Sequence, residues 1–389
     1  MILRICLVSK SWPSHQRSGL SLAAASHLRI LAANGHVVSI IGSHSSVLSE
    51  QLPATQKFYV RSTGSGALYS PARVDRDLLI KAFQDCSPDL IIIEGWQTAL
   101  TTAAVQIAFM RAIPTLMVSH GISLHPFSGR FTDRLRSLAW EPYKRFVLPD
   151  LIAKIDSITT LDRSASSLRF FDRDLSRRLG KTVLPLVNAP INWLSDFRAR
   201  NKRKSQVLVI GYYSPIKNQL AALDVAARIS SDLSFKFIGE KLGRYYEICV
   251  RRTYELGMGH RVVFMNDSEC NLSEEISNSL VVLSTSVTEV LPLTLLEAMA
   301  SGTPFVATPV GAVPFLEGGI CAEGVDDLSN AVLTLIDDHE VWQQLSASGR
   351  RQHAERYTTA NVSMQLEAAI NAALRTAKAR RKDLITKNL

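Results

Sequence analysis

The sequence of 389 residues has few cysteines and no long hydrophobic run. Its five cysteines occur singly, without Cys-x-x-Cys spacing, so reduced thiols in a cytoplasmic protein are predicted instead of a disulfide framework or a zinc site. No stretch of about 18 apolar residues is present, and no membrane-spanning helix is predicted. The apolar start at 2–8 is short and interrupted by Arg4, which favours a first β-strand over the core of a signal peptide.

Several common binding motifs are also missing. No Gly-x-Gly-x-x-Gly follows the first strand, so the usual dinucleotide site is not expected. Gly180-Lys181-Thr182 resembles the end of a P-loop, but Leu175 stands where the loop needs its first glycine. The pairs Asp75/Asp77 and Asp172/Asp174 lie in polar, arginine-rich stretches, which are typical of solvated helix starts and not of a metal site. No metal and no cofactor are therefore expected.

The charge of the chain is unevenly distributed. Of 44 basic and 35 acidic residues, 24 and 14 fall within 1–200, so this half carries a net +10 while the remainder carries −1. Such asymmetry is typical of a domain that meets an anionic partner: a membrane surface, a phosphorylated substrate or a nucleic acid. A basic surface that only aids solubility is the alternative. With 46% apolar residues, the chain is long enough for two or three domains with cores of their own.

Short apolar runs alternate with helix-like stretches through the first half. Residues 20–34 have helical periodicity and stop before Gly35, as helices often do before a C-terminal glycine. The predicted strands of this half lie at 2–8, 37–41, 90–93, 115–118, 157–160 and 182–186. Continuous apolar strands that alternate with helices are typical of a parallel sheet covered on both faces.

A second alternation follows a polar, basic stretch at 192–205. Its predicted strands lie at 207–210, 235–238, 261–264, 279–283 and 304–308. The fold class predicted is α/β, with two doubly wound parallel-sheet domains and a binding cleft between them, since such sheets bind ligands at the carboxyl ends of their strands. The predicted parts are an N-terminal Rossmann-like domain over 1–190, a linker over 191–205, a C-terminal Rossmann-like domain over 206–360, and a helix with a basic tail over 361–389 that could pack on the N-terminal domain.

The segment from Glu289 to Pro304 carries the most chemical information. A polar loop over 284–290 follows a predicted strand, and a helix is expected to start after Pro292. The beginning of a helix offers free backbone N–H groups and a positive dipole end, which suit a phosphate. Glu297 would lie on that helix, where a carboxylate can accept hydrogen bonds from the paired hydroxyls of a ribose.

This segment closely resembles the E-x7-E signature of retaining glycosyltransferases of family 4, which have the GT-B fold of two Rossmann-like domains. Further segments resemble landmarks of that family over most of the chain. They are His120-Gly121 after a first-domain strand, the stretch before it at 88–91 and 94–97, Gly211 to Asn218 in a loop with a phosphate-binding lysine, 237–239 and 261–264 at two strands, and 308–314 after the signature.

The resemblance implies roles for the matched residues. Glu297 would hold the ribose, Glu289 would hold the donor sugar, and Lys217 would neutralise the leaving diphosphate without a metal ion. His120 would lie over the donor sugar near the reaction centre. The remaining donor-site positions are Gly211, Tyr212, the backbone of Leu291, Pro292 and Leu293, Ser18-Gly19 beside the phosphates or acceptor, and Asn266 beside the base. Three positions depart from the family pattern. Tyr212 replaces an arginine that would supply a second phosphate cation, Ser18-Gly19 replaces the usual Gly-Gly near the first loop, and Phe315 replaces the glutamate that commonly follows Pro314.

A basic and aromatic stretch lies between residues 129 and 154 of the first half. Arginines and aromatic rings that interleave on a helix suit a membrane interface, and each basic residue near an anionic bilayer contributes about 1 kcal/mol. The residues assigned to a membrane or acceptor surface are Arg130, Arg134, Arg136, Trp140, Lys144 and Arg145. A helix with its apolar side in the core and its arginines in water is the alternative.

The resemblance implies a retaining glycosyltransferase that moves a hexosyl-type sugar from a UDP- or GDP-sugar to a lipid-linked or surface-polysaccharide acceptor. We expect it to be cytoplasmic and peripheral on the inner face of the membrane, with no nucleic-acid partner, because no base-stacking motif is evident. A sucrose-type or other small-acceptor transferase is the alternative among enzymes. A non-catalytic binding or scaffold protein of the same fold, with a donor site weakened at Tyr212, is the alternative outside them.

Overall fold

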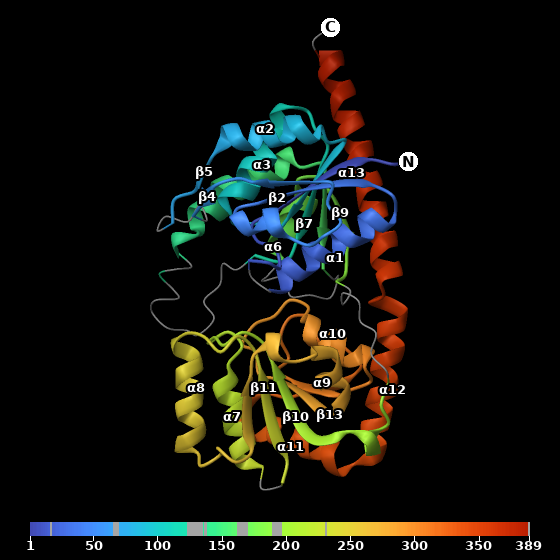
Figure 1. Ribbon diagram of the computed structural model, residues 1–389. Helices are drawn as coiled ribbons and strands as arrows, with labels where there is room; N and C mark the ends of the chain where they lie inside the picture. The colour runs from blue at the N-terminus through green and yellow to red at the C-terminus, as the bar shows by residue number, and fades with distance from the viewer. Residues whose placement is uncertain are drawn as a thin grey trace. The chain divides into compact units, whose positions relative to one another are not determined.

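The computed structural model describes residues 1–15, 18–64, 70–122, 135, 138–161, 170–188, 197–229 and 232–387, the last five of these by their backbone alone. The chain divides into two compact units, and Figure 1 labels many of their helices and strands. Unit 1 comprises Met1–Ile191 and Thr359–Leu389, and unit 2 comprises Asn192–Thr358.

The sheet of unit 1 is parallel, with the strand order β3-β2-β1-β6-β7-β8-β9. Its strands are β1 (Arg4–Ser9), β2 (Val37–Gly42), β3 (Gln56–Tyr59), β6 (Leu90–Glu94), β7 (Thr115–Ser119), β8 (Ser157–Thr160) and β9 (Thr182–Pro185). A separate antiparallel pair is formed by β4 (Ser62–Thr63) and β5 (Arg73–Val74). The order reverses between β1 and β6, so the carboxyl ends of these strands and of β7 form the edge at which such sheets bind ligands.

The helices of unit 1 bury the apolar faces of the sheet, and several of them begin at side-chain caps. Ser18, Asp75 and Thr98 each accept a bond from a backbone N–H of the first turn that follows. The helical segments are η1 (Ser45–Ser49), α1 (Gly19–Ala33), α2 (Arg76–Cys86), α3 (Ala99–Met110), η2 (Tyr143–Val147), α5 (Leu148–Lys154), α6 (Phe171–Arg178) and α13 (Thr359–Lys387).

The C-terminal helix α13, red in Figure 1, belongs to unit 1 although the whole of unit 2 precedes it in the sequence. It packs against α1, β7, β8 and β9. Among its contacts, Glu367 bonds to His36 at 2.9 Å, and Arg380 forms an ion pair with the buried Asp156 at 3.2 Å.

The sheet of unit 2 is also parallel, with the order β12-β11-β10-β13-β14-β15. Its strands are β10 (Lys204–Ile210), β11 (Ser234–Ile238), β12 (Val262–Met265), β13 (Ser279–Ser284), β14 (Phe305–Ala307) and β15 (Gly319–Cys321). The helices are η3 (Arg200–Lys202), α7 (Gln219–Arg228), α8 (Arg244–Glu255), η4 (Asp267–Glu269), α9 (Leu272–Asn278), α10 (Leu293–Ala300), η5 (Val313–Phe315), α11 (Gly324–Asp337) and α12 (His339–Arg356). The predicted fold class, two doubly wound parallel α/β domains, is confirmed.

The basic stretch before β10 is part of unit 2, where the sequence suggested a linker up to residue 205. Arg203 is only 8% exposed, and its guanidinium donates to the hydroxyl of Thr303 and to the carbonyls of Ser279 and Ser301. It also lies 5.1 Å from the ring of Trp342. The polar, basic composition of this segment predicts solvent-exposed arginines. Arg203 is instead buried, and its hydrogen bonds attach the segment to the core of unit 2. Within the described ranges no helix is long and apolar enough to cross a bilayer.

Candidate functional site

The carboxyl edge of the unit 2 sheet begins with two glycines that bring loops close together. Gly211 follows β10 with φ +147°, a conformation that side-chain-bearing residues rarely adopt. Gly239 follows β11, and a Cβ atom there would lie 2.2 Å from the carbonyl oxygen of Gly211. Both positions therefore require glycine, and they shape the loop that leads to Lys217.

Lys217 and Glu289 form an ion pair at this edge. The ammonium Nζ lies 2.5 Å from Oε1 of Glu289, and the two side chains are 19% and 15% exposed. The aliphatic stem of Lys217 covers Gly211, where an added Cβ atom would lie 3.4 Å away from it. The structure thus joins two residues that the sequence places 72 positions apart. A mostly buried cation held this way can exchange its carboxylate partner for an incoming anion.

Neighbouring loops hold the backbone around Glu289 on both sides. The hydroxyl of Thr285 donates to the carbonyl of Asn218 at 2.8 Å, which ties the segment after β13 to the Lys217 loop. On the other side, Gly311 packs so closely that a Cβ atom there would lie 2.3 Å from the carbonyl oxygen of Glu289. Ala312 N–H also donates to the carbonyl of Val290 at 2.8 Å. The position of Glu289 is therefore fixed by its surroundings.

Helix α10 begins directly after this segment, as the sequence predicts. Its N-cap is Pro292, and no side chain in the described part of the chain caps its first turn. Backbone N–H groups at such a start remain available to an anion. Leu291 is buried at 5% exposure, Leu293 opens the helix, and Glu297 lies in its second turn at 8% exposure.

Tyr212 and Asn266 occupy the flanks of this region. The Tyr212 side chain is 47% exposed, and its ring centroid lies 5.9 Å from Nζ of Lys217. Its carbonyl accepts a bond of 3.0 Å from the buried Gln219, which begins α7. The side-chain amide of Asn266 bonds to two loops. Its oxygen accepts a bond of 2.8 Å from Lys241 N–H, and its nitrogen donates to Glu269 at 3.0 Å. Asn266 therefore joins the loops after β11 and β12.

In unit 1, His120 follows β7 and bonds to Glu94, the last residue of β6. Nε2 of His120 lies 2.7 Å from Oε2 of Glu94, and Nδ1 of His27, from α1, lies 2.8 Å from Oε1. Glu94 and His27 are each 1% exposed. Burial alone would raise the pKa of Glu94, but the imidazoles of His27 and His120 outweigh it and lower that pKa to about 2.

Asp172 supplies a second buried carboxylate behind the same strand ends, which corrects its interpretation as part of a solvated helix start. It is fully buried on α6 and accepts a bond of 2.9 Å from the indole of Trp96 and another from Ser119, the residue before His120. Burial raises the pKa of Asp172 to about 6 even though both bonds lower it. Asp174 remains half exposed, as expected.

Gly19 is the first residue of α1, and Ser18 caps that helix by accepting a 3.3 Å bond from Ser21 N–H. Among the residues that the structure describes, none lies within 4 Å of where a Cβ atom at Gly19 would stand.

The proposed membrane surface divides into buried, exposed and undescribed residues. Trp140 is 5% exposed and packs edge-on against Tyr143 in the core, so the structure removes it from that surface. Trp140 belongs to the same buried cluster as Ile107 of α3 and Leu151 of α5, so the apolar side of this segment faces the core, which is the alternative that the sequence left open. Lys144 is 42% exposed and Arg145 is exposed. Arg130, Arg134 and Arg136 lie outside the described residues.

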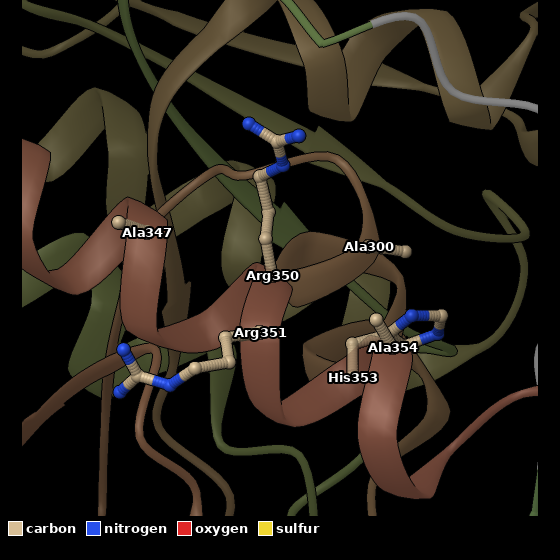
Figure 2. Close-up of a pocket in the computed structure, with 6 residues that line it drawn as sticks. All are labelled: Ala300, Ala347, Arg350, Arg351, His353 and Ala354. Carbon is tan, nitrogen blue, oxygen red and sulfur yellow. The ribbon is translucent and has the colours of Figure 1, made fainter.

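A pocket of about 480 Å³ lies elsewhere in unit 2, between α10 and α12. Figure 2 shows Arg350, Arg351 and His353 extending from α12 in different directions. Arg350 stacks over Phe197 at 4.3 Å, and Arg351 lies 3.5 Å from Glu317, so both cations already have partners. None of the predicted site residues lines this pocket.

Comparisons with known protein sequences find similarity to glycosyltransferases within unit 2. Residues 204–338 match the model of the family described as glycosyl transferases group 1. The D-inositol 3-phosphate glycosyltransferase of Corynebacterium diphtheriae is 32% identical over 126 residues, 31% of this chain and 29% of that protein. The N-acetyl-alpha-D-glucosaminyl L-malate synthase of Bacillus anthracis is 24% identical over 175 residues, 43% and 46% of the two proteins. The matched part thus spans less than half of each relative.

Solved structures resemble the chain over nearly its whole length. Anabaena HepE in complex with UDP and glucose superposes with a TM-score of 0.71 at 17% identity, covering 95% of this chain and 99% of that one. Sucrose-phosphate synthase from Thermosynechococcus elongatus gives 0.70 at 16% identity, with 94% and 98% covered. The chain has the GT-B fold. The family match within unit 2 supports the GT-B glycosyltransferase superfamily, and the Lys217–Glu289 pair lies inside the matched region.

Proposed function

We propose that this GT-B protein is a retaining glycosyltransferase of family 4 that transfers a hexosyl-type sugar from a UDP- or GDP-sugar. The observation that carries the proposal is the ion pair of Lys217 and Glu289 beside the uncapped start of α10. The ammonium group of Lys217 and the backbone N–H groups at the helix start suit a diphosphate, and a fixed carboxylate suits sugar hydroxyls. HepE, which shares the fold, binds UDP-glucose in its solved complex.

In this proposal each residue acts on one part of the donor. Lys217 and the start of α10 stabilise the charge that develops on the leaving diphosphate, which makes the reaction independent of a metal ion. Glu289 and the backbone of 291–293 hold the sugar, and Glu297 accepts bonds from the ribose. The acceptor hydroxyl attacks C1 from the face that the diphosphate leaves, the C1–O bond to the diphosphate breaks, and the diphosphate takes the hydroxyl proton.

Unit 1 supplies the acceptor side and His120 in the proposal. We propose a lipid-linked or surface-polysaccharide acceptor and peripheral attachment to the inner face of the membrane. Support comes from exposed apolar and basic side chains on one short segment: Leu138 is 64% exposed, Phe146 is 70% exposed, and Arg145 lies next to Phe146.

The attachment is tested by sedimentation with vesicles that contain or lack an anionic phospholipid. Phe146→Ser should weaken binding to anionic vesicles, whereas Tyr254→Ser, which changes a 74% exposed aromatic residue of unit 2, should not. Equal binding by both variants would contradict the membrane assignment.

A second candidate is a non-catalytic binding or scaffold protein of the same fold. Tyr212 favours it, because an exposed tyrosine stands beside Lys217 where the family pattern has an arginine. Such a protein would bind nucleotides weakly and consume no donor.

The test is thermal stability in the presence of UDP, GDP, ADP and their sugars. A ligand that binds the folded protein raises its melting temperature. One nucleotide family should raise it for the wild type and for Glu275→Ala, which changes a carboxylate paired with Lys236 away from the site, but not for Glu297→Ala. Equal shifts in both variants would contradict the assignment of Glu297, and no shift at millimolar ligand would favour the scaffold.

A further inference from the structure

The buried group of His27, Glu94 and His120 has a chemistry that neither the family resemblance nor the comparisons assign. Glu94 presents one carboxylate oxygen to each imidazole, at 2.8 Å to Nδ1 of His27 and 2.7 Å to Nε2 of His120. The three side chains come from α1, from the end of β6 and from the residue after β7. His120 alone reaches the surface, with 10% of its side chain exposed.

We propose that Glu94 and His27 are positioning residues that fix the orientation and the tautomer of His120. The inference rests on the proposed function for its consequence in catalysis, but the positioning itself is a property of unit 1 alone. An ionised carboxylate only accepts hydrogen bonds, so each imidazole must donate the N–H that faces it. In its neutral form, His120 then carries its proton on Nε2 and presents Nδ1 as an acceptor, to which none of the described residues donates.

The surroundings of His27 fix which of its ring nitrogens carries the proton. Its Nε2 is buried and has no hydrogen-bond partner within the described part of the chain. A proton on that nitrogen would be a buried, unsatisfied donor, whereas a lone pair there is less costly. His27 is therefore held as the tautomer with its proton on Nδ1, which donates to Glu94 and keeps the carboxylate in place.

The variant Glu94→Gln should change the tautomer of His120. A glutamine amide has one acceptor and one donor group, so only one imidazole can keep its N–H bond to residue 94. Because His27 cannot move its proton to the buried Nε2, the amide oxygen should remain with His27. The amide nitrogen would then donate to Nε2 of His120, whose proton moves to Nδ1. Nδ1 of His120 would then be a donor, and a substrate hydroxyl could no longer donate a hydrogen bond to it.

The first test records ¹⁵N NMR spectra of the ligand-free protein with labelled histidine, in buffer basic enough to keep imidazoles neutral. The wild type should show His120 as the Nε2–H tautomer, and Glu94→Gln should show the Nδ1–H tautomer. Asp172→Asn, which changes an equally buried carboxylate that bonds to Trp96, should leave the signal unchanged. An unchanged His120 signal in Glu94→Gln would overturn the proposal.

The second test measures consumption of the UDP- and GDP-sugar panel. Glu94→Gln should lower kcat by about 10- to 100-fold, by analogy with the loss of a carboxylate that orients a metal-bound histidine, with a smaller change in KM. His27→Asn keeps a donor at the Nδ1 position and should retain turnover, whereas His27→Leu should lose it. Equal turnover in these two variants would overturn the role of His27. Wild-type protein that shows the NMR signature but consumes no donor would contradict the proposed function and not the positioning.

Discussion

Removing the carboxylate of Glu289 should strengthen the binding of a free nucleoside diphosphate. In the ligand-free protein Lys217 already has a partner at 2.5 Å, so a diphosphate must compete with Glu289 for the ammonium group. Coulomb's law at an effective dielectric constant of about 20 gives about 7 kcal/mol of attraction at this distance, and desolvation of the two charges offsets most of it. A net contribution of about 1 to 2 kcal/mol remains, which corresponds to a factor of about 5 to 30 in binding.

We therefore expect Glu289→Gln to bind UDP or GDP about 5- to 30-fold more tightly than the wild type in isothermal titration calorimetry. The same variant should lose sugar transfer, because the sugar loses its carboxylate partner. Lys217→Met should lose about 10- to 100-fold in affinity for the same nucleotide, since a bond to a charged group contributes about 1.5 to 3 kcal/mol.

The matched control is the ion pair of Lys236 and Glu275, which is 13% and 16% exposed and lies 2.8 Å apart in the same unit. Lys236→Met should leave nucleotide affinity unchanged. If Glu289→Gln binds both nucleotides no more tightly than the wild type, or if Lys236→Met and Lys217→Met lose the same affinity, Lys217 is not the group for which Glu289 and the diphosphate compete.

Three further predictions concern affinity and stability. Tyr212→Arg should tighten UDP or GDP binding about 5- to 30-fold by adding a second cation, and unchanged calorimetric affinity would contradict a phosphate site at this loop. Arg203→Met should lower the free energy of unfolding by about 3 to 5 kcal/mol in urea titrations, because buried carbonyls of Ser279 and Ser301 lose their donor; a loss below about 1 kcal/mol would contradict this. Burial raises the pKa of Asp172 to about 6, so the folded state holds the proton more tightly than the unfolded chain, and Asp172 lowers stability as pH rises from about 4 through 6. Asp172→Asn should therefore destabilise the protein less at neutral pH than at about pH 4, and a pH-independent difference in urea titrations would contradict the assigned burial.

The sheets and the donor-side residues follow from local sequence patterns. Apolar strands such as Leu90–Glu94 alternate with helices, and a parallel sheet is the packing that buries both faces of such strands. Pro292 and the polar residues before it predict the loop that precedes α10 and the start of this helix after Pro292. Lys217 and Glu289 were found by resemblance, but their pairing depends on how loops after different strands meet.

His120 was predicted from the sequence, but its link to Glu94 and His27 was not, because the three residues lie far apart in the sequence. His27 occurs in an alanine-rich helix and bonds to a residue 67 positions away. A signal was nevertheless present, since Glu94 ends an otherwise apolar strand and a carboxylate there must find partners. Arg203 and Trp140 were expected in exposed segments, Arg203 in a basic linker and Trp140 on a membrane surface. Both side chains are buried by tertiary packing, which their local sequence does not indicate.

The central claim is tested most directly by ¹H NMR of donor hydrolysis in the absence of any acceptor. The wild type should slowly consume one α-linked UDP- or GDP-sugar and release the α-anomer first, because water takes the place of the acceptor on the retained face. Lys217→Met should release it at least tenfold more slowly, as expected when a group that stabilises the leaving charge is lost. Release of the β-anomer first, or no consumption of any donor beyond the rate in buffer, would contradict a retaining glycosyltransferase.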